Sequence, residues 1–147
     1  MPASNFNVGR DCQVVIQHPM ATGPGNRLDL SIVTDFDPKQ NVVEASVDGL
    51  DGKFRSASLP KSWSGTIGID RANNACDLFI TALENAYYNG RKVPPGSVYQ
   101  YITETDESVT RYQFDQCSFH LPMAGSWKND TVVKMQLGFI AARRRVV

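Results

Sequence analysis

The sequence predicts a mainly β fold (β+α), an antiparallel sandwich or barrel of about seven strands flanked by one α-helix at about residues 71–89. Apolar residues alternate with polar ones along most of the chain, which is the period of half-buried strands. Only one segment has helical spacing. The last third contains successive strand patterns at residues 98–106, 109–121 and 131–142.

The length and charge predict one domain, 1–147, with no strong electrostatic attraction to a partner. A chain of 147 residues can bury a sizeable core without metals or disulfides. Its 15 basic and 15 acidic residues cancel. No segment has the ~20 apolar residues that span a bilayer, so we expect a soluble chain made in the cytoplasm, with no membrane partner. The distant cysteines Cys12, Cys76 and Cys117 indicate reduced, mostly buried thiols.

The first half predicts a hairpin followed by a polar arm. Residues 28–32 and 43–47 alternate, which predicts paired strands with a turn near Pro38 to Asn41. The segment from 48 to 61 is polar and ends near Pro60, so it suits an arm or an edge strand that extends from the domain.

An alternating strand at residues 63–69 leads into the helix. Gly65 and Gly68 within it predict close approach by a neighbour or a bulge. Asp70 is expected to cap the helix and Gly90 to end it. The apolar stripe of the helix must lie against the sheet or against another subunit. It consists of Ala75, Leu78, Phe79, Ala82, Leu83 and Ala86.

The C-terminal strands carry more specific signals. Along residues 109–121 the large apolar side chains change phase, from Tyr112 and Phe114 to Cys117, which predicts a bulge or a crossing between two packing surfaces. From Val133 to Ala141 the phase is constant, which predicts a central strand.

No residue pattern indicates catalysis or metal binding. Cys117 and His120 are three residues apart on a predicted strand, which turns their side chains to opposite faces. Neither His120 nor His18 has a metal ligand at a close spacing. The acids within 104–107 lie at a predicted hairpin tip, where charged residues are common. We expect a protein that is not an enzyme and that has no cofactor or metal site.

The triplet Arg143, Arg144 and Arg145 allows three interpretations. It could contact nucleic-acid phosphates, form a solvated tail, or make ion pairs with carboxylates of another subunit. We favour the subunit interface, because the triplet continues directly from a predicted buried strand and ends in two valines.

Several segments, in their order and spacing, resemble bacteriophage tail tube proteins, particularly those of long, contractile tails. The resemblance spans nearly the whole chain. The segments are Asn5 to Asp11, Trp63 to Ile67 with Asp70 and Arg71, Ala86 to Tyr88, Tyr112 to Phe114, Ala124 to Trp127, and Ala142 to Arg145.

The resemblance implies a structural virion protein. Six copies would close into a ring whose joined sheets line a channel, and stacked rings would form the tube through which DNA leaves the capsid. The implied partners are further copies of the chain and sheath, baseplate and tail-terminator proteins. Viral DNA would cross the lumen without specific binding, and assembly would take place in the host cytoplasm. A tail completion or baseplate protein, or a type VI secretion tube subunit, is the alternative within this fold.

Carboxylates on the channel face would repel the phosphates of passing DNA, and the candidates are Asp29, Asp35 and Glu44. The arm at 48–61 and the N-terminal residues before Cys12 are expected to contribute to ring stacking. The candidate interface residues are Asp48, Asp51, Lys53, Phe54, Arg55, Arg143, Arg144 and Arg145.

A small β-barrel that binds single-stranded nucleic acid is the hypothesis from a different class. Tyr99 and Tyr101 offer stacking surfaces, and the arginine triplet offers positive charge.

Overall fold

The structure, a computed structural model, describes residues 6–21, 23–30 and 32–147. Two antiparallel sheets share one long strand, β5 (Val109–Ser126). Sheet A has the order β1 (Cys12–Gln17), β4 (Gly96–Thr103), β5, β7 (Arg143–Val146). Sheet B has the order β5, β6 (Lys134–Ala141), β3 (Phe54–Asp70), β2 (Ile32–Asp48).

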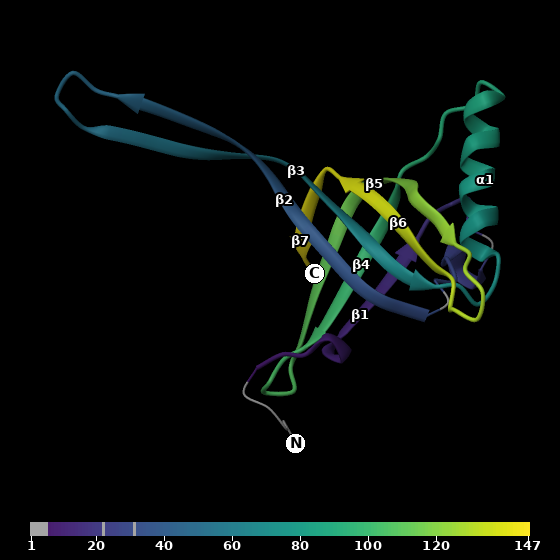
Figure 1. The fold of residues 1–147 in the computed structure, drawn as a ribbon. Coiled ribbons are helices and arrows are strands. Elements are labelled where there is room, and N and C mark those ends of the chain that lie inside the picture. The colour runs from purple at the N-terminus through teal and green to yellow at the C-terminus, as the bar shows by residue number, and fades with distance from the viewer. Residues whose placement is uncertain (1–5, 22, 31) are drawn as a thin grey trace.

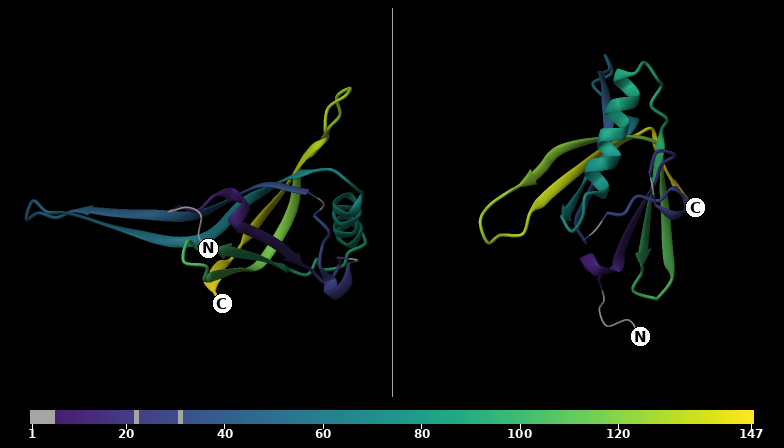
Figure 2. Two further views of the ribbon diagram at one scale, coloured as in Figure 1. Left: turned by 90° about the horizontal axis from the view of Figure 1, so that it is seen from below. Right: turned by 90° about the vertical axis from the view of Figure 1, so that its right-hand side faces the viewer.

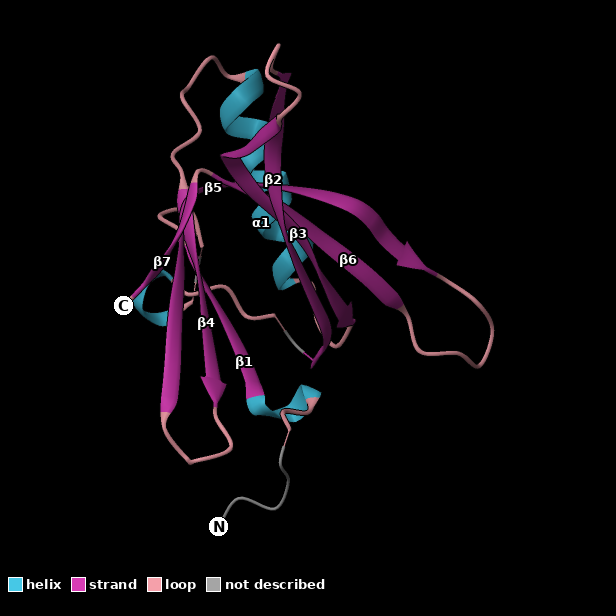
Figure 3. Cartoon of the chain, turned by 90° about the vertical axis from the view of Figure 1, so that its left-hand side faces the viewer, coloured by secondary structure: helices cyan, strands magenta, loops and turns pink. Residues whose placement is uncertain are grey.

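The two sheets meet at the shared strand, and β1 and β2 are the two ends of the strand order. Figure 3 shows β7, β4 and β1 on the left and β3 and β6 on the right. The architecture is therefore an open, sandwich-like arrangement and not a closed barrel. The short helices η1 (Gly9–Asp11) and η2 (Pro24–Asn26) flank β1, and the single α-helix among the described residues is α1 (Ala75–Tyr88).

The shared strand changes sheet at a bulge, which confirms the predicted phase change. Val98 of β4 pairs with Phe114 and Gly96 pairs with Cys117, so β5 has one extra residue here. Gln116 within the bulge has a φ of 50°. The extra residue lets Phe114 and Cys117 both point into the core despite their odd spacing, and both are fully buried.

The core lies between the sheets and is rich in aromatic rings. Phe36 of β2 stacks on Phe139 of β6, with ring centroids 5.9 Å apart, and both contact Phe114 of β5. Strand β6 lies between β5 and β3 and keeps one buried phase, which confirms the predicted central strand.

The predicted hairpin at residues 28–47 is wrong. β2 runs without a turn through Pro38 to Asn41, and the connection to β3 lies beyond Asp48. Pro38 does not end the strand because β2 is an edge strand, where a missing N–H costs no sheet hydrogen bond. Leu28 and Leu30 are buried but lie outside any strand, and residue 31 of that predicted strand lies outside the described residues. Residues 54–61 of the predicted polar segment belong to the long strand β3.

The helix begins later than predicted. Asp70 ends β3 and pairs with Lys134 at 3.3 Å, so the predicted Asp70 cap is wrong. The Asn73 side chain instead accepts a hydrogen bond from the N–H of Ala75 at 3.0 Å. Gly90 follows the helix with a φ of 74°, which confirms the predicted stop. The buried face of α1 consists of Cys76, Phe79, Leu83 and Ala86, whereas Leu78, predicted on this face, is exposed.

Two hairpins project from the body. The outer part of β2 and β3, residues 41–62, extends far from the sheets, on the side opposite α1 (Figure 1); we call these residues the arm. The connection between β5 and β6, residues 127–133, forms a second, shorter projection (Figure 2).

Candidate assembly surfaces

The arm is a two-stranded ribbon with a well-defined tip. At the tip, the N–H of Gly49 donates to the carbonyl of Lys53 at 2.8 Å, and Gly52 has a φ of 79°. The Asp51 carboxylate accepts from the N–H of Lys53 and pairs with Arg55 at 3.0 Å. These hydrogen bonds lower the pKa of Asp51. A ribbon of two strands needs such local bonds because it has no core of its own.

The arm is exposed along its length. Residues 41–48 and 50–61 are all solvent-exposed, and apolar side chains are prominent at the tip, with Leu50 fully exposed and Phe54 66% exposed. The candidate interface residues Asp48, Asp51, Lys53, Phe54 and Arg55 all lie at this tip. Toward the body, the pairs Ala45–Ala57 and Ser46–Ser56 make the ribbon thin.

The arginine triplet forms most of strand β7, and the strand alternation turns its side chains to opposite faces. Arg145 lies on the outer face of sheet A, where it pairs with Asp115 and donates to Gln113 at 3.3 Å. Arg144 points the other way, toward the space between the sheets, and is half-buried. The Arg143 side chain is exposed and makes no hydrogen bond, ion pair or ring contact with the described residues.

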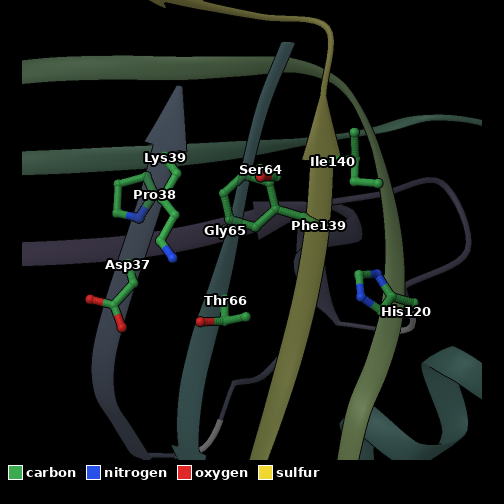
Figure 4. Close-up of a pocket in the computed structure, with 9 residues that line it drawn as sticks. All are labelled: Asp37, Pro38, Lys39, Ser64, Gly65, Thr66, His120, Phe139 and Ile140. Carbon is green, nitrogen blue, oxygen red and sulfur yellow. The ribbon is translucent and has the colours of Figure 1, made fainter. Parts of the chain in front are cut away.

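The outer face of sheet B is polar and hollowed. Small residues on β3 and β6 leave a hollow of about 690 Å³, and Figure 4 shows Asp37 of β2, Thr66 of β3 and His120 of β5 around it. Gly138 lies beneath the His120 ring, since a Cβ there would approach the ring at 2.5 Å. Lys39 and Ser64 also line the hollow. This face can meet water or a polar partner, and it carries charges of both signs.

The three channel candidates do not share a surface. Asp35 lies on the outer face of sheet B, where its carboxylate covers Gly68. Glu44 is on the arm, opposite Ser58. Asp29 lies between η2 and β2, and its carboxylate accepts a hydrogen bond from Asn73, just before α1, at 2.8 Å. Sequence reasoning missed Asp37 and Lys39 because it placed a turn at this point of β2.

The outer face of sheet A combines aromatic and basic side chains. Tyr99 and Tyr101 lie on this face of β4, and Arg111 of β5 pairs with Tyr101. These three residues and Arg10 line an open hollow of about 580 Å³. The sequence identifies this pair of tyrosines but groups them with the arginine triplet, whereas their basic neighbours in the structure are Arg10 and Arg111.

The buried titratable side chains, Cys76, Cys117 and His18, pack within the apolar core. Burial raises the pKa of Cys117 to about 12 and that of Cys76 to about 11, so both thiols stay protonated. His120 is exposed on the far side of the sheet from buried Cys117, as the spacing predicts. His18 is 1% exposed, and its ring lies edge-on to Phe79 and Phe119.

Among the described residues, no group of three or more His, Cys, Asp or Glu side chains could hold a metal ion. The described part of the chain also has no helix long and apolar enough to cross a membrane.

The fold is shared with proteins of phage-like tails, although no family model and no curated protein matches the sequence. A chain in the anti-feeding prophage cap, a tube-terminating cap, has a TM-score of 0.62 at 10% identity, covering 99% of this chain and 93% of that one. A chain in the sheath/tube terminator of PVC, an extracellular contractile injection system, has a TM-score of 0.61 at 10% identity, covering 99% of both chains.

The SPP1 tail tube is a third similar structure. Its TM-score is 0.59 at 13% identity, and the match covers 95% of this chain and 77% of that one. Near-complete coverage means that the similarity includes the sheets, the helix and the arm region together. The chain therefore has a tail-tube-like fold, in agreement with the sequence resemblance.

Proposed function

We propose that this protein is a non-enzymatic structural subunit that forms six-membered rings, which stack into a tail tube for DNA. The similarity of nearly the whole chain to tube and tube-terminating proteins is the main support. Two features of this chain add to it: an open sheet with exposed edges, and an arm far longer than a single domain needs. Both features suit a chain that completes its structure with neighbouring copies.

Ring closure uses the two edges of sheet B. At one edge β2 pairs only with β3, and at the other the second half of β5 pairs with β6, within the described residues. Pairing β2 of one copy with β5 of the next continues the sheet from subunit to subunit. Because the two edges differ, the contact is head-to-tail, which is the type that closes rings. It also covers edges that would otherwise promote aggregation.

The outer face of sheet B then lines the channel. Asp35 and Asp37 on this face repel phosphates, while Lys39 and His120 are its basic side chains around the hollow. Candidate Glu44 would lie where the arm meets the next ring, and Asp29 lies away from the lumen beside α1. DNA crosses such a surface without a specific contact.

The arm contributes to stacking between rings through its tip. Leu50 and Phe54 supply apolar area, and Asp48, Asp51, Lys53 and Arg55 supply complementary charges around it. Residues 6–11 at the N-terminus are a second stacking element, and the predicted contribution of residues 1–5 lies outside the described residues. Arg143, which is exposed, remains the member of the triplet available for a contact between subunits.

Electron microscopy of the purified protein, combined with light scattering, tests this proposal. We expect rings or hollow tubes, and a species that stays monomeric at every concentration and in the presence of a tail initiator would contradict it. The variant Leu50→Ser with Phe54→Ser should remain folded and shorten or abolish the tubes. Val109→Ser, an exposed apolar change on sheet A, is the matched control.

The partners and location follow from assembly. A tube of this kind works inside a virion tail, is built in the host cytoplasm and meets sheath, baseplate and terminator proteins. Proteins of this fold also occur in a baseplate and in tube-terminating caps, so a completion or baseplate role, or a secretion tube, is the alternative. A single ring that does not stack would favour the terminator.

A nucleic-acid-binding module is the second candidate, because Tyr99 and Tyr101 share the outer face of sheet A with Arg111. Binding of single-stranded DNA to the monomer, weakening steeply with salt and lost in Tyr99→Ala, would favour it. No measurable affinity favours the tube.

A further inference from the structure

The orientation of the arm is decided at its root. Beyond the root, β2 and β3 pair only with each other, and their side chains are exposed. Trp63 is the last β3 residue with a strand on both sides: it pairs with Gln40 of β2 and with Ala141 of β6. The direction of the whole arm therefore depends on the structure around Trp63.

A bulge weakens the ladder at this point. The register shifts between Asn41 and Val42, which leaves Lys61 as an extra residue on β3. A bulge bends and twists a hairpin locally, and a two-stranded ribbon twists easily. Besides the backbone hydrogen bonds, the Asn41 side chain donates to the Ser62 and Ser64 hydroxyls across this bend, at 3.1 and 3.2 Å.

Arg144 lies at this bend between two aromatic rings. Its guanidinium carbon is 4.2 Å from the ring centroid of Trp63 in sheet B and 4.1 Å from that of Tyr112 in sheet A. Trp63 also contacts the Phe114 ring, with centroids 5.9 Å apart. The planar cation can stack on both rings at once, so Arg144 links the arm root to the opposite sheet.

The neighbouring arginine holds β7 in position for this contact. Arg145 points to the other face, where it forms its ion pair with Asp115 of β5, with a second bond between these groups of 3.2 Å. Strand β7 has four residues and pairs only with β5. Side-chain bonds on both faces compensate for so short an edge strand.

We propose that Arg144, stacked between Trp63 and Tyr112, is a positioning residue that fixes the direction of the arm before assembly. A fixed arm loses less conformational entropy when it docks on a neighbouring copy. This role in assembly rests on the proposed tube function, whereas the effect on arm direction does not. The two parts can be measured separately.

The arm direction is measured in the monomer by double electron–electron resonance. Spin labels are attached at Ser56→Cys on the arm and Thr105→Cys on the β4–β5 turn, both exposed positions, in a Cys12→Ser background. Cys76 and Cys117 are buried thiols and stay unlabelled. We expect one narrow distance distribution for the parent protein and a distribution at least twice as broad for Arg144→Ala.

Two further variants separate stacking from charge. Arg144→Lys keeps the charge but loses the planar group, so it should also broaden the distribution. Arg143→Ala removes an exposed neighbouring arginine and should leave it narrow. If Arg144→Ala lowers stability too far, Tyr112→Leu tests the same stack from the other side. A distribution as narrow as that of the parent in Arg144→Ala and Tyr112→Leu, with both folded, overturns the proposal.

Electron microscopy of the same variants tests the consequence for assembly. Arg144→Ala should form fewer and shorter tubes than the parent protein and the surface control Val109→Ser. If the parent forms no tubes but Arg144→Ala frees the arm, the proposed function fails while the role of Arg144 stands. If the parent forms tubes and Arg144→Ala leaves the arm fixed, the role of Arg144 fails while the proposed function stands.

Discussion

His18 should make the stability of the protein depend on pH. Burial lowers its pKa below the ordinary value of 6.5, although a hydrogen bond with the Pro94 backbone opposes this shift. As pH falls below 6.5, the unfolded chain takes up this proton more readily than the folded one. The free energy of unfolding should therefore decrease from pH 7 to pH 5.

Urea unfolding at both pH values checks this expectation. His18→Gln should be less stable at pH 7 but should lose less stability on acidification than the parent. His120→Gln is the control, because that ring is exposed, and it should keep the parent's pH dependence. An equal loss in His18→Gln and the parent would assign the pH dependence to groups other than His18.

The cysteines should differ sharply in reactivity. The pKa values of about 12 for Cys117 and about 11 for Cys76 leave almost no thiolate at pH 8, whereas Cys12 is only half-buried. A thiol reagent at pH 8 should modify Cys12 alone in the native protein and all three in urea. Cys12→Ser should remove the native reaction. Rapid native modification of Cys117 would show an accessible thiolate and reopen the question of catalysis.

Single residues divide into those whose surroundings follow from local spacing and those whose surroundings do not. The opposite faces of Cys117 and His120 follow from strand geometry and could be predicted. The partners of Arg144 and Arg145 could not, because Trp63 and Asp115 come from strands far away in the chain. From the sequence alone the arginine triplet could equally be a solvated tail, and its contacts become clear only from the pairing of β7 with β5.

Gly96 is the point where three elements meet, and a side chain there should destabilise the fold. A Cβ on Gly96 would approach the His18 ring at 2.6 Å and the Gln17 carbonyl and Phe119 ring at 3.0 Å. These groups are enclosed by α1 and β5, so Gly96→Ala should lower the free energy of unfolding by about 1–3 kcal/mol.

Gly9→Ala is the matched control, since a Cβ there meets nothing within 4 Å. Denaturant unfolding of both variants measures the difference. Equal stability would mean that the junction between β1, β4 and β5 can open to admit a methyl group.

Elements with one uniform environment were predicted well. β6 has a constant phase because both its neighbours are in place along its whole length, and α1 has a clear apolar stripe. The bounds of β2 and β3 were not predicted, because each strand leaves the body halfway along and becomes part of a solvated ribbon, although the predicted strand at 63–69 lies within β3. An alternation broken by Pro38 and a polar continuation look like two short strands and a loop. The pairing of β2 with β3 along the full hairpin shows that these segments form two continuous strands.

The molecule as a whole shows why fold similarity survives at 10% identity. The core requires apolar residues at alternating positions and a bulge in β5, and many sequences meet these requirements. Surface residues differ more freely, because the fold does not depend on their identity. For this reason the resemblance to tail tube proteins was carried by the order and spacing of several segments, not by any single motif. A shared face for the channel candidates Asp29, Asp35 and Glu44 could not be predicted, since the three residues have different surroundings once the chain is folded.

The charge of the proposed channel gives a test at the scale of the whole molecule. If the outer face of sheet B lines the tube, Asp35→Lys with Asp37→Lys changes each subunit by four charges, and a ring of six by about 24. Phosphates would then be attracted where they were repelled. Tubes of this variant should bind DNA with an affinity that falls steeply as salt rises, measurable by co-sedimentation at about 50 and 200 mM salt.

The matched control places the same kind of charge on another surface. Asp106→Lys lies at the β4–β5 turn, where its carboxylate bonds only to Ser108 among the described residues. Tubes carrying this change should not retain DNA inside, so nuclease added afterwards should digest any DNA bound to them. DNA held by the Asp35 and Asp37 variant should be protected from nuclease within the bore. Unprotected DNA in both cases would place the outer face of sheet B on the outside of the tube and require the channel to be lined by sheet A.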